Sequence, residues 1–228
     1  MKIEVLDDPD SVAHEAAAMI AADARQAVVD RGQFIFAVSG GKTPWVMLRY
    51  LADEDVPWTK VHLVQVDERV APAGHTDRNF THLRESLLTR VRLRSEQVHA
   101  MPVEAPDLEA AAMRYSRALE EIAGLPAVLD LVHLGLGPDG HTASLVPHDP
   151  VLEVTDSDVA LTGTYQGRRR MTLTYPILNR ARRILWLVTG KDKAGPLAQL
   201  VDADVSIPAG RVSQDQAFVL ADHDAVTD

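Results

Sequence analysis

The hydrophobic positions of this chain form short apolar runs that alternate with longer stretches rich in alanine and leucine. The runs contain many β-branched residues and predict strands, whereas the stretches have the length and spacing of helices. The predicted strands are 2–6, 33–39, 61–66, 129–134, 171–175, 184–189 and 217–222. The predicted helices are 9–30, 45–53, 79–91, 107–123, a short one from Pro176, and 190–200.

This alternation is typical of parallel βαβ units and predicts an α/β fold. We expect a Rossmann-like, open and mainly parallel sheet with helices on both faces. A single domain over residues 1–228 is expected, because no repeat, linker or charge block divides the chain. Asp10 or Ser11 is the expected cap of the first helix, and Gly32 follows its end. The segment 148–168 shows no regular pattern and receives no assignment.

Composition narrows the class of partner. The net charge of −10 argues against nucleic acid, because binding a phosphate backbone needs a basic surface, but a few local cations can still hold a small anion. The chain has no cysteine, which excludes disulfides and thiolate metal sites and favours a cytoplasmic location. No apolar stretch reaches the length of a membrane span, and the start MKIEVLDDPD lacks the apolar segment of a secretory signal.

The segment 131–147, LVHLGLGPDGHTASLVP, carries the most informative chemistry. A buried strand is expected to run into a turn with three glycines, and this turn holds Asp139 and His141 two residues apart. Glycines let the backbone approach a ligand closely, and open α/β sheets bind ligands at the carboxyl ends of their strands. His141 is therefore a candidate acid or base, with Asp139 as the carboxylate beside it.

A second glycine turn, VSGGKTP, follows the strand 33–39 and precedes a helix. Backbone N–H groups at a helix N-terminus bind anions, so the candidate phosphate-binding residues are Ser39, Gly40, Gly41, Lys42 and Thr43. A nucleotide-binding P-loop is the rival interpretation. It requires a glycine five residues before Gly41, where this chain has Phe36, and Pro44 stands where the P-loop helix should already be under way.

Charged residues border three further strands. The strand 61–66 is followed directly by Asp67, Glu68 and Arg69. Side-chain alternation predicts that Asp67 and Arg69 point one way and Glu68 the other. Three arginines precede the strand 171–175, and two lysines follow the strand 184–189, where both residue types could bind phosphate. These five residues are Arg168, Arg169, Arg170, Lys191 and Lys193. Alternation lets only one of Arg169 and Arg170 face a pocket.

Nine histidines make a metal site worth considering. However, His133, His141 and His148 lack the i, i+4 spacing of a zinc-binding helix. His133 lies within an apolar strand, where a packed core residue is the expectation. We therefore predict neither a metal nor another cofactor.

The turn GLGPDGHTASL closely resembles the signature of the 6-phosphogluconolactonase family, whose members hydrolyse 6-phospho-δ-gluconolactone in the oxidative pentose phosphate pathway. Four further blocks resemble the family in the right order. They are FAVSGGKTP at 36–44, VQVDERVAP at 64–72 with the DRNF that follows, RRMTLTYPILNRA at 169–181, and TGKDKA at 189–194. Glucosamine-6-phosphate deaminase and its isomerase relatives share some of these blocks in looser form.

The resemblance implies a lactonase mechanism without a covalent nucleophile. His141 is then the general base toward water, Asp139 orients it, and Arg69 stabilises charge developing on the lactone carbonyl. Asp67 lies in the same block and is counted with the substrate-binding residues, as a brace for the loop or for a neighbouring charge.

The resemblance also implies where the phosphate of the substrate is held. The loop 39–43 is expected to bind it together with Arg170 and Lys193, which are favoured over Arg169 and Lys191. Two departures from the family pattern stand out: Arg78 replaces the usual serine of a DSN triplet, and the approach to the arginine strand is shortened to TYQGRRR. Neither is expected to touch the proposed catalytic residues, and both are expected to alter the rim of the pocket.

Two alternatives remain open. An isomerase or deaminase of the same superfamily would use Asp67 as a base on carbon, but GHTASL differs from the GHIAFN-like sequence expected of the deaminases. A non-enzymatic sugar-phosphate sensor would be expected to carry a DNA-binding helix-turn-helix, for which the chain has no spare segment. The expected partner is thus a small sugar phosphate, not nucleic acid or a membrane; the pattern does not distinguish a monomer from a homodimer.

Overall fold

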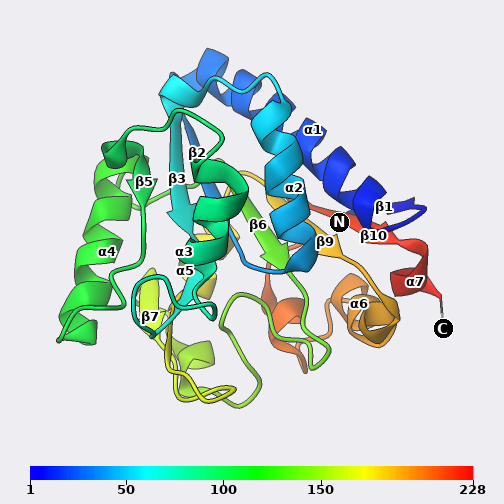
Figure 1. The fold of residues 1–228 in the computed structure, drawn as a ribbon. Helices are drawn as coiled ribbons and strands as arrows, with labels where there is room; N and C mark the ends of the chain where they lie inside the picture. Colours follow the sequence, from blue (N-terminus) through cyan, green and yellow to red (C-terminus); the bar gives the residue numbers. More distant parts are fainter. Residues whose placement is uncertain (228) are drawn as a thin grey trace.

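In a computed structural model, which describes residues 1–227, a sheet of seven parallel strands forms the centre of the molecule (Figure 1). From edge to edge the strands are β1 (Lys2–Leu6), β10 (Ala217–Asp222), β9 (Ile184–Val188), β6 (Leu131–Gly135), β2 (Phe34–Val38), β3 (Val61–Gln65) and β5 (Val98–His99). β2 and β9 are buried along their whole length, as continuous apolar runs predict for strands covered on both faces. The predicted parallel α/β architecture is confirmed.

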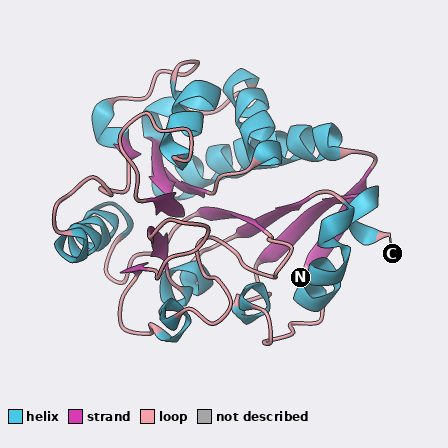
Figure 2. Cartoon of the chain, turned by 60° about the horizontal axis from the view of Figure 1, so that its bottom comes forward, coloured by secondary structure: helices cyan, strands magenta, loops and turns pink. Residues whose placement is uncertain are grey.

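Helices cover both faces of this sheet (Figure 2). One face carries α1 (Pro9–Arg31) and α2 (Lys42–Asp53), and the other carries α4 (Leu108–Ala123), α5 (Tyr175–Arg180) and α6 (Ala194–Val201). Successive side chains of β2 enter different cores: Phe36 packs under α1 and α2, and Ala37 packs on the opposite face. This alternation is the period-two geometry of a strand.

The first helix begins at a different cap from the one expected. Asp8 is the N-cap of α1, and its carboxylate accepts a hydrogen bond from the Ser11 N–H at 2.7 Å. The prediction of Asp10 or Ser11 is wrong, because both residues lie inside the helix. Gly32 does end the helix in a left-handed conformation, with φ of 80°.

A second, antiparallel sheet of three strands lies beside the first. It consists of β4 (Asp67–Arg69), β8 (Arg170–Leu173) and β7 (Val159–Leu161), with β8 in the middle. The predicted strand 171–175 therefore does not join the parallel sheet, and part of the unassigned segment 148–168 is β7. Val66 connects the two sheets, because its N–H donates to Val38 O (3.1 Å) and its carbonyl accepts from Leu173 N (2.8 Å).

The remaining elements are short. The predicted helix 79–91 is α3 (Asn79–Leu83), which continues as a π-helical turn from Arg84 to Leu88. A 3₁₀ turn at Lys191–Lys193 precedes α6, and the chain adds α7 (His223–Val226) after β10. Further 3₁₀ turns are Trp58–Lys60, Ser95–Gln97, Pro150–Glu153 and Pro208–Arg211. Within residues 1–227, no helix combines the length and the apolar character required to cross a membrane.

Candidate active site

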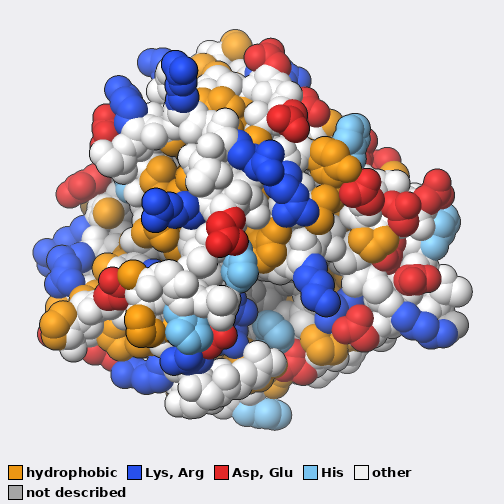
Figure 3. All heavy atoms as spheres, viewed as in Figure 1, with side chains coloured by type: hydrophobic (Ala, Val, Ile, Leu, Met, Phe, Trp, Pro, Cys, Tyr) orange, Lys and Arg blue, Asp and Glu red, His pale blue; other side chains and the backbone are white. Residues whose placement is uncertain are grey.

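A cavity of about 510 Å³ opens at the carboxyl ends of β2, β6 and β9, and the antiparallel sheet closes its side. Figure 3 shows a hollow on this face of the molecule, bordered by histidine and by basic and acidic side chains. Ten of the eleven predicted site residues line the cavity: Ser39, Gly40, Gly41, Lys42, Thr43, Asp67, Arg69, His141, Arg170 and Lys193. The eleventh, Asp139, contacts His141 from behind.

His141 and Asp139 form a hydrogen-bonded pair. His141 Nδ1 lies 2.5 Å from Asp139 Oδ1, and the backbone N–H of His141 donates to the same oxygen at 3.2 Å. If the carboxylate is ionised, Nδ1 carries the proton and Nε2 keeps its lone pair. Burial opposes ionisation of Asp139, but hydrogen bonds from His141 and Tyr165 outweigh it and lower the pKa of Asp139. The pair therefore fixes the tautomer that leaves Nε2 able to accept a proton.

Glycine is required in the turn that carries this pair. A Cβ on Gly137 would lie 2.0 Å from His141 Nδ1 and 2.7 Å from Asp139 Oδ1, so no larger residue leaves the pair in place. The Gly137 N–H donates to the His141 carbonyl at 2.8 Å and closes the turn. Gly140 has φ of 78°, a left-handed conformation that other residues rarely adopt.

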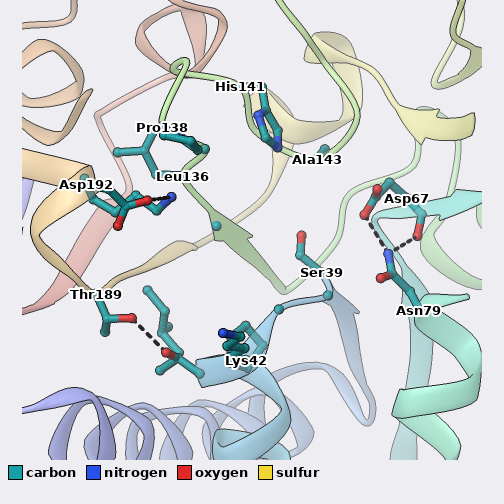
Figure 4. A pocket seen from close by; sticks show the side chains of 18 of the residues that line it. Ser39, Lys42, Asp67, Asn79, Leu136, Pro138, His141, Ala143, Thr189 and Asp192 are labelled. Carbon is teal, nitrogen blue, oxygen red and sulfur yellow. Dashed lines mark hydrogen bonds and ion pairs between the residues drawn. The ribbon is translucent and has the colours of Figure 1, made fainter. Parts of the chain in front are cut away.

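The loop from Ser39 to Thr43 forms the floor of the cavity beneath His141 (Figure 4). Gly41 is the N-cap of α2 and offers no side chain to the first helical N–H groups, which makes this a helix N-terminus available to an anion. A Cβ on Gly40 would lie 2.0 Å from Asn79 Oδ1, so the close approach of loop and α3 also depends on glycine. Thr43 Oγ1 lies 2.8 Å from Thr189 Oγ1, which joins the loop to the end of β9.

His133 supports the loop from below and is completely buried. Its Nδ1 accepts a hydrogen bond from the Ser39 N–H at 3.2 Å, and its carbonyl accepts from Ser39 Oγ at 3.0 Å. Burial without a charged partner lowers the pKa of His133 to about 3, so the ring is neutral. The prediction of a packed core residue is confirmed. Among residues 1–227, no three His, Cys, Asp or Glu side chains come together as metal ligands.

The strand β4 directs its side chains as alternation predicts: Asp67 and Arg69 line the cavity and Glu68 points away. Asp67 is 4% exposed, and its carboxylate accepts from Ser144 Oγ at 2.7 Å and from Asn79 Nδ2 at 3.1 Å. Arg69 donates to Asn79 Oδ1. Asn79 therefore links the carboxylate and the guanidinium, and both are held in fixed orientations.

Glu68 is fully buried and organises the backbone behind the cavity. It accepts hydrogen bonds from the N–H groups of Arg69, Asn79 and Phe80, each at 2.8 Å. The Glu68 carboxylate also forms a salt bridge with Arg78, whose Nε lies 3.2 Å from Glu68 Oε2. Arg78 also contacts Glu104 and does not line the cavity, so the expectation that it alters the pocket rim is wrong.

Of the three consecutive arginines Arg168, Arg169 and Arg170, only Arg170, the first residue of β8, faces this cavity. Arg169 points outward toward Glu109, and Arg168 pairs with Asp77. Arg170 is 3% exposed, and its Nε has no hydrogen-bond partner among residues 1–227. Burial and the neighbouring Arg69 lower the pKa of Arg170 from its ordinary value. Two adjacent guanidinium groups with an unfilled donor favour the binding of an anion.

Lys193, in the 3₁₀ turn that follows β9, supplies a further cation to the cavity. Its Nζ lies 2.8 Å from Asp192 Oδ2, and both residues line the cavity, whereas Lys191 does not. Figure 4 shows Asp192 and Thr189 on one side of the cavity and Asp67 and Asn79 on the other, with His141 between them.

Sequence reasoning missed several residues of the site. Asn79, Thr189 and Asp192 line the cavity, and Ser144 and Tyr165 contact residues that line it. Tyr165 belongs to the shortened TYQGRRR segment, and its hydroxyl lies 3.0 Å from Asp139 Oδ2. The expectation that this departure leaves the proposed catalytic residues untouched is therefore wrong.

The fold and the cavity define an α/β protein with a hydrogen-bonded His–Asp pair and several cations around one pocket at the carboxyl edge of a parallel sheet. A family model described as glucosamine-6-phosphate isomerases/6-phosphogluconolactonase matches residues 7–220. The chain therefore belongs to the glucosamine-6-phosphate isomerase/6-phosphogluconolactonase family.

Relatives within this family share most of their length with the chain. The 6-phosphogluconolactonase of Mycobacterium tuberculosis is 39% identical, over 98% of this chain and 96% of the relative. That of Synechocystis is 36% identical, over 87% and 84%. The crystal structure of 6-phosphogluconolactonase from Thermotoga maritima matches with a TM-score of 0.86 at 28% identity, over 97% of this chain and 98% of that one. A monomeric glucosamine-6-phosphate deaminase shares the fold, with a TM-score of 0.83 at 19% identity.

Proposed function

We propose that this protein hydrolyses 6-phospho-D-glucono-1,5-lactone to 6-phospho-D-gluconate, a step of the oxidative pentose phosphate pathway. The observation that carries the proposal is the His141–Asp139 pair, whose imidazole lines the same cavity as two adjacent guanidinium groups. The names of the relatives support the same activity, because relatives that cover most of the chain are named 6-phosphogluconolactonase. A δ-lactone is an activated ester, so the site needs to activate water, stabilise an oxyanion and hold the substrate.

His141 is the general base in this proposal. Its Nε2 accepts a proton from water as the oxygen attacks the lactone carbonyl carbon, and general-base catalysis of this kind contributes about 10²–10⁴ in rate. The His141 imidazole then gives this proton to the ring oxygen of the lactone as the bond between that oxygen and the carbonyl carbon breaks. Asp139 holds Nδ1–H throughout and stabilises the imidazolium that forms between the two steps.

Arg69 stabilises the negative charge on the carbonyl oxygen of the tetrahedral intermediate. Asn79 fixes its guanidinium before substrate binds, so no reorganisation is needed during the reaction. Asp67 is held by Ser144 and Asn79 and serves as a brace beside Arg69 and Arg170.

The phosphate is bound by the Ser39–Thr43 loop, Arg170 and Lys193. Helix N-terminal N–H groups and guanidinium groups both suit a phosphate dianion. Anchoring the phosphate at fixed cations orients the lactone carbonyl against His141.

A proton-release assay tests this function directly. Freshly prepared 6-phosphogluconolactone should release acid much faster with the protein than by spontaneous hydrolysis, and glucosamine 6-phosphate should yield no ammonia under the same conditions. Ammonia release with no acceleration of lactone hydrolysis would instead assign the deaminase branch of the family.

Other properties stay predictions. The cysteine-free composition supports a cytoplasmic protein, and the net charge of −10 supports a partner that is a small molecule and not nucleic acid or a membrane. The single domain over residues 1–228 and independence from metals and other cofactors are likewise our proposals.

A further inference from the structure

Tyr165 contacts the far side of the carboxylate that holds His141. Its hydroxyl donates to Asp139 Oδ2 at 3.0 Å, while Asp139 Oδ1 accepts from His141 Nδ1 at 2.5 Å. Each oxygen of the carboxylate thus has its own partner. A carboxylate bonded through one oxygen alone can rotate about its Cβ–Cγ bond, whereas one held at both oxygens cannot do so without losing a hydrogen bond.

The ring of Tyr165 contacts both His141 and Arg170. Its edge packs against the His141 imidazole, with centroids 5.5 Å apart and planes at 63°, and the Arg170 guanidinium carbon lies 5.0 Å from its centroid. Both contacts have geometries that stabilise aromatic rings. Tyr165 does not line the cavity, so it reaches the substrate only through these neighbours.

A tight turn delivers Tyr165 to this position. Tyr165 and Arg168 exchange backbone hydrogen bonds of 2.9 and 3.2 Å, and the two residues between them, Gln166 and Gly167, have φ of 50° and 78°. Positive φ at both central residues is the type I′ geometry of two-residue hairpins. Arg168 Nη2 lies 2.9 Å from Asp77 Oδ2 and ties the end of the turn to the loop before α3.

We propose that Tyr165 is a positioning residue of the active site, which holds Asp139 so that the carboxylate presents the His141 imidazole to the attacking water. The inference rests on the proposed lactone hydrolysis, because it assigns Tyr165 a part in that reaction. Burial and the bond to Asp139 raise the pKa of Tyr165, so its hydroxyl remains protonated and remains a donor.

The chain contains a second Tyr–Asp–His group that serves as a matched control. Tyr50 donates to Asp10 Oδ2 at 2.8 Å, and its ring meets His14 edge-on at 5.2 Å and 78°. This group joins α1 to α2 and does not line the cavity. Tyr50→Phe therefore removes the same kind of hydroxyl and the same kind of hydrogen bond without touching the site.

The test measures kcat and KM by proton release for the wild type, Tyr165→Phe, Asp139→Asn, the double variant, and Tyr50→Phe. We expect Tyr165→Phe to lower kcat about tenfold with KM within about twofold, because misorientation of a catalytic group costs transition-state stabilisation. In the Asp139→Asn background the same change should have no further effect, since Tyr165 acts through Asp139. Tyr50→Phe should leave both constants within about twofold of the wild type.

The outcomes separate failure of this inference from failure of the proposed function. A wild type that does not accelerate lactone hydrolysis contradicts the function, and the role of Tyr165 falls with it. An active wild type with an unchanged Tyr165→Phe variant contradicts the inference alone. A loss confined to KM, or losses that add up in the double variant, would also contradict the inference alone. Loss of cooperative thermal unfolding in Tyr165→Phe but not in Tyr50→Phe would contradict it too, because the role of Tyr165 would then be structural. ¹⁵N NMR of the His141 ring gives a readout without substrate: the Nδ1–H tautomer should dominate in the wild type and decrease in Tyr165→Phe.

Discussion

The two sheets of this protein carry their site residues in different places. In the parallel sheet the polar residues follow the strands: Ser39 lies beyond β2, His141 beyond β6, and Lys193 beyond β9. In the antiparallel sheet the charges lie within the strands, with Asp67 and Arg69 in β4 and Arg170 in β8.

The difference determines how each group is held. Asp67 and Arg170 are almost completely buried, and hydrogen bonds from or to neighbouring side chains fix them. His141 is 21% exposed and stands on a turn, so its orientation depends on glycine geometry and on Asp139. We infer that the two sheets have different roles. His141, in a loop that follows the parallel sheet, transfers the proton, and the strands of the antiparallel sheet supply charges in fixed positions.

Removing the base should have the largest effect. His141→Ala should lower kcat at least about a hundredfold with a modest change in KM, the signature of a lost transition-state interaction. His148 is the control, because it is exposed, lies after the same turn and does not line the cavity. Its φ is 65°, which asparagine tolerates, so His148→Asn should keep most of the activity. A folded His141→Ala protein with near-full kcat would end the assignment of His141 as the base.

Moving the base without removing it should cost almost as much. In Gly137→Ala the new Cβ would displace His141 and Asp139, and we expect kcat to fall about thirtyfold. Gly195→Ala is the matched control: apart from neighbouring atoms of its own helix, nothing lies within 4 Å of its Cβ position, and it sits in α6, where alanine is the better helix former. Equal kinetics for the two glycine variants would show that the turn does not need its present geometry.

Substituting Arg170, a cation within a strand, and Lys193, a cation in a turn, tests whether both bind the substrate phosphate. Arg170→Ala and Lys193→Ala should each weaken kcat/KM for 6-phosphogluconolactone about ten- to a hundredfold more than for unphosphorylated gluconolactone, since a charged hydrogen bond is lost only with the former. The outward-facing Arg169→Ala should leave the ratio of the two substrates unchanged. Equal losses on both lactones would show that neither cation reads the phosphate.

His133 is a buried titratable residue in the centre of the parallel sheet, and acid should reveal its effect on stability. Burial lowers the pKa of His133 to about 3 in the fold, against 6.5 for an unperturbed histidine. Between these values the unfolded chain binds a proton that the folded chain does not, so the free energy of unfolding decreases as pH falls, by up to about 1.4 kcal/mol per pH unit. His133→Asn keeps an acceptor for the Ser39 N–H and should flatten this slope in urea unfolding between pH 6.5 and 4. An unchanged slope would mean that other groups cause the acid sensitivity.

Sequence alone predicted the parallel sheet apart from its edge strand β5, because β2, β6 and β9 are mainly apolar runs between helical stretches. It did not predict β4, β5 and β7, since strands of two or three residues give too little alternation to recognise, and β4 consists of charged residues only. Nothing in the run after Arg170 distinguishes a strand of the second sheet from one of the first.

The same limit applies to the site. Glycine turns and charged strand ends are local signals, and together with the family resemblance they identified ten of the residues that line the cavity. Ser144 and Tyr165 act through contacts with residues 77 and 26 positions away, and no local pattern marks such pairs. Asn79 was visible only as part of the DRNF block, without its bonds to Asp67 and Arg69.

The central claim, that His141 acts on water while Asp67 only braces the charged side, is tested most directly by hydrolysis in D₂O. A base on carbon would exchange a substrate C–H proton with solvent, whereas a base on water moves no carbon proton. NMR of the 6-phosphogluconate formed should show no deuterium on carbon beyond that in an enzyme-free control. Enzyme-dependent deuterium at C2 would contradict the account, because it would place the chemistry on a carbon acid and make Asp67 its base.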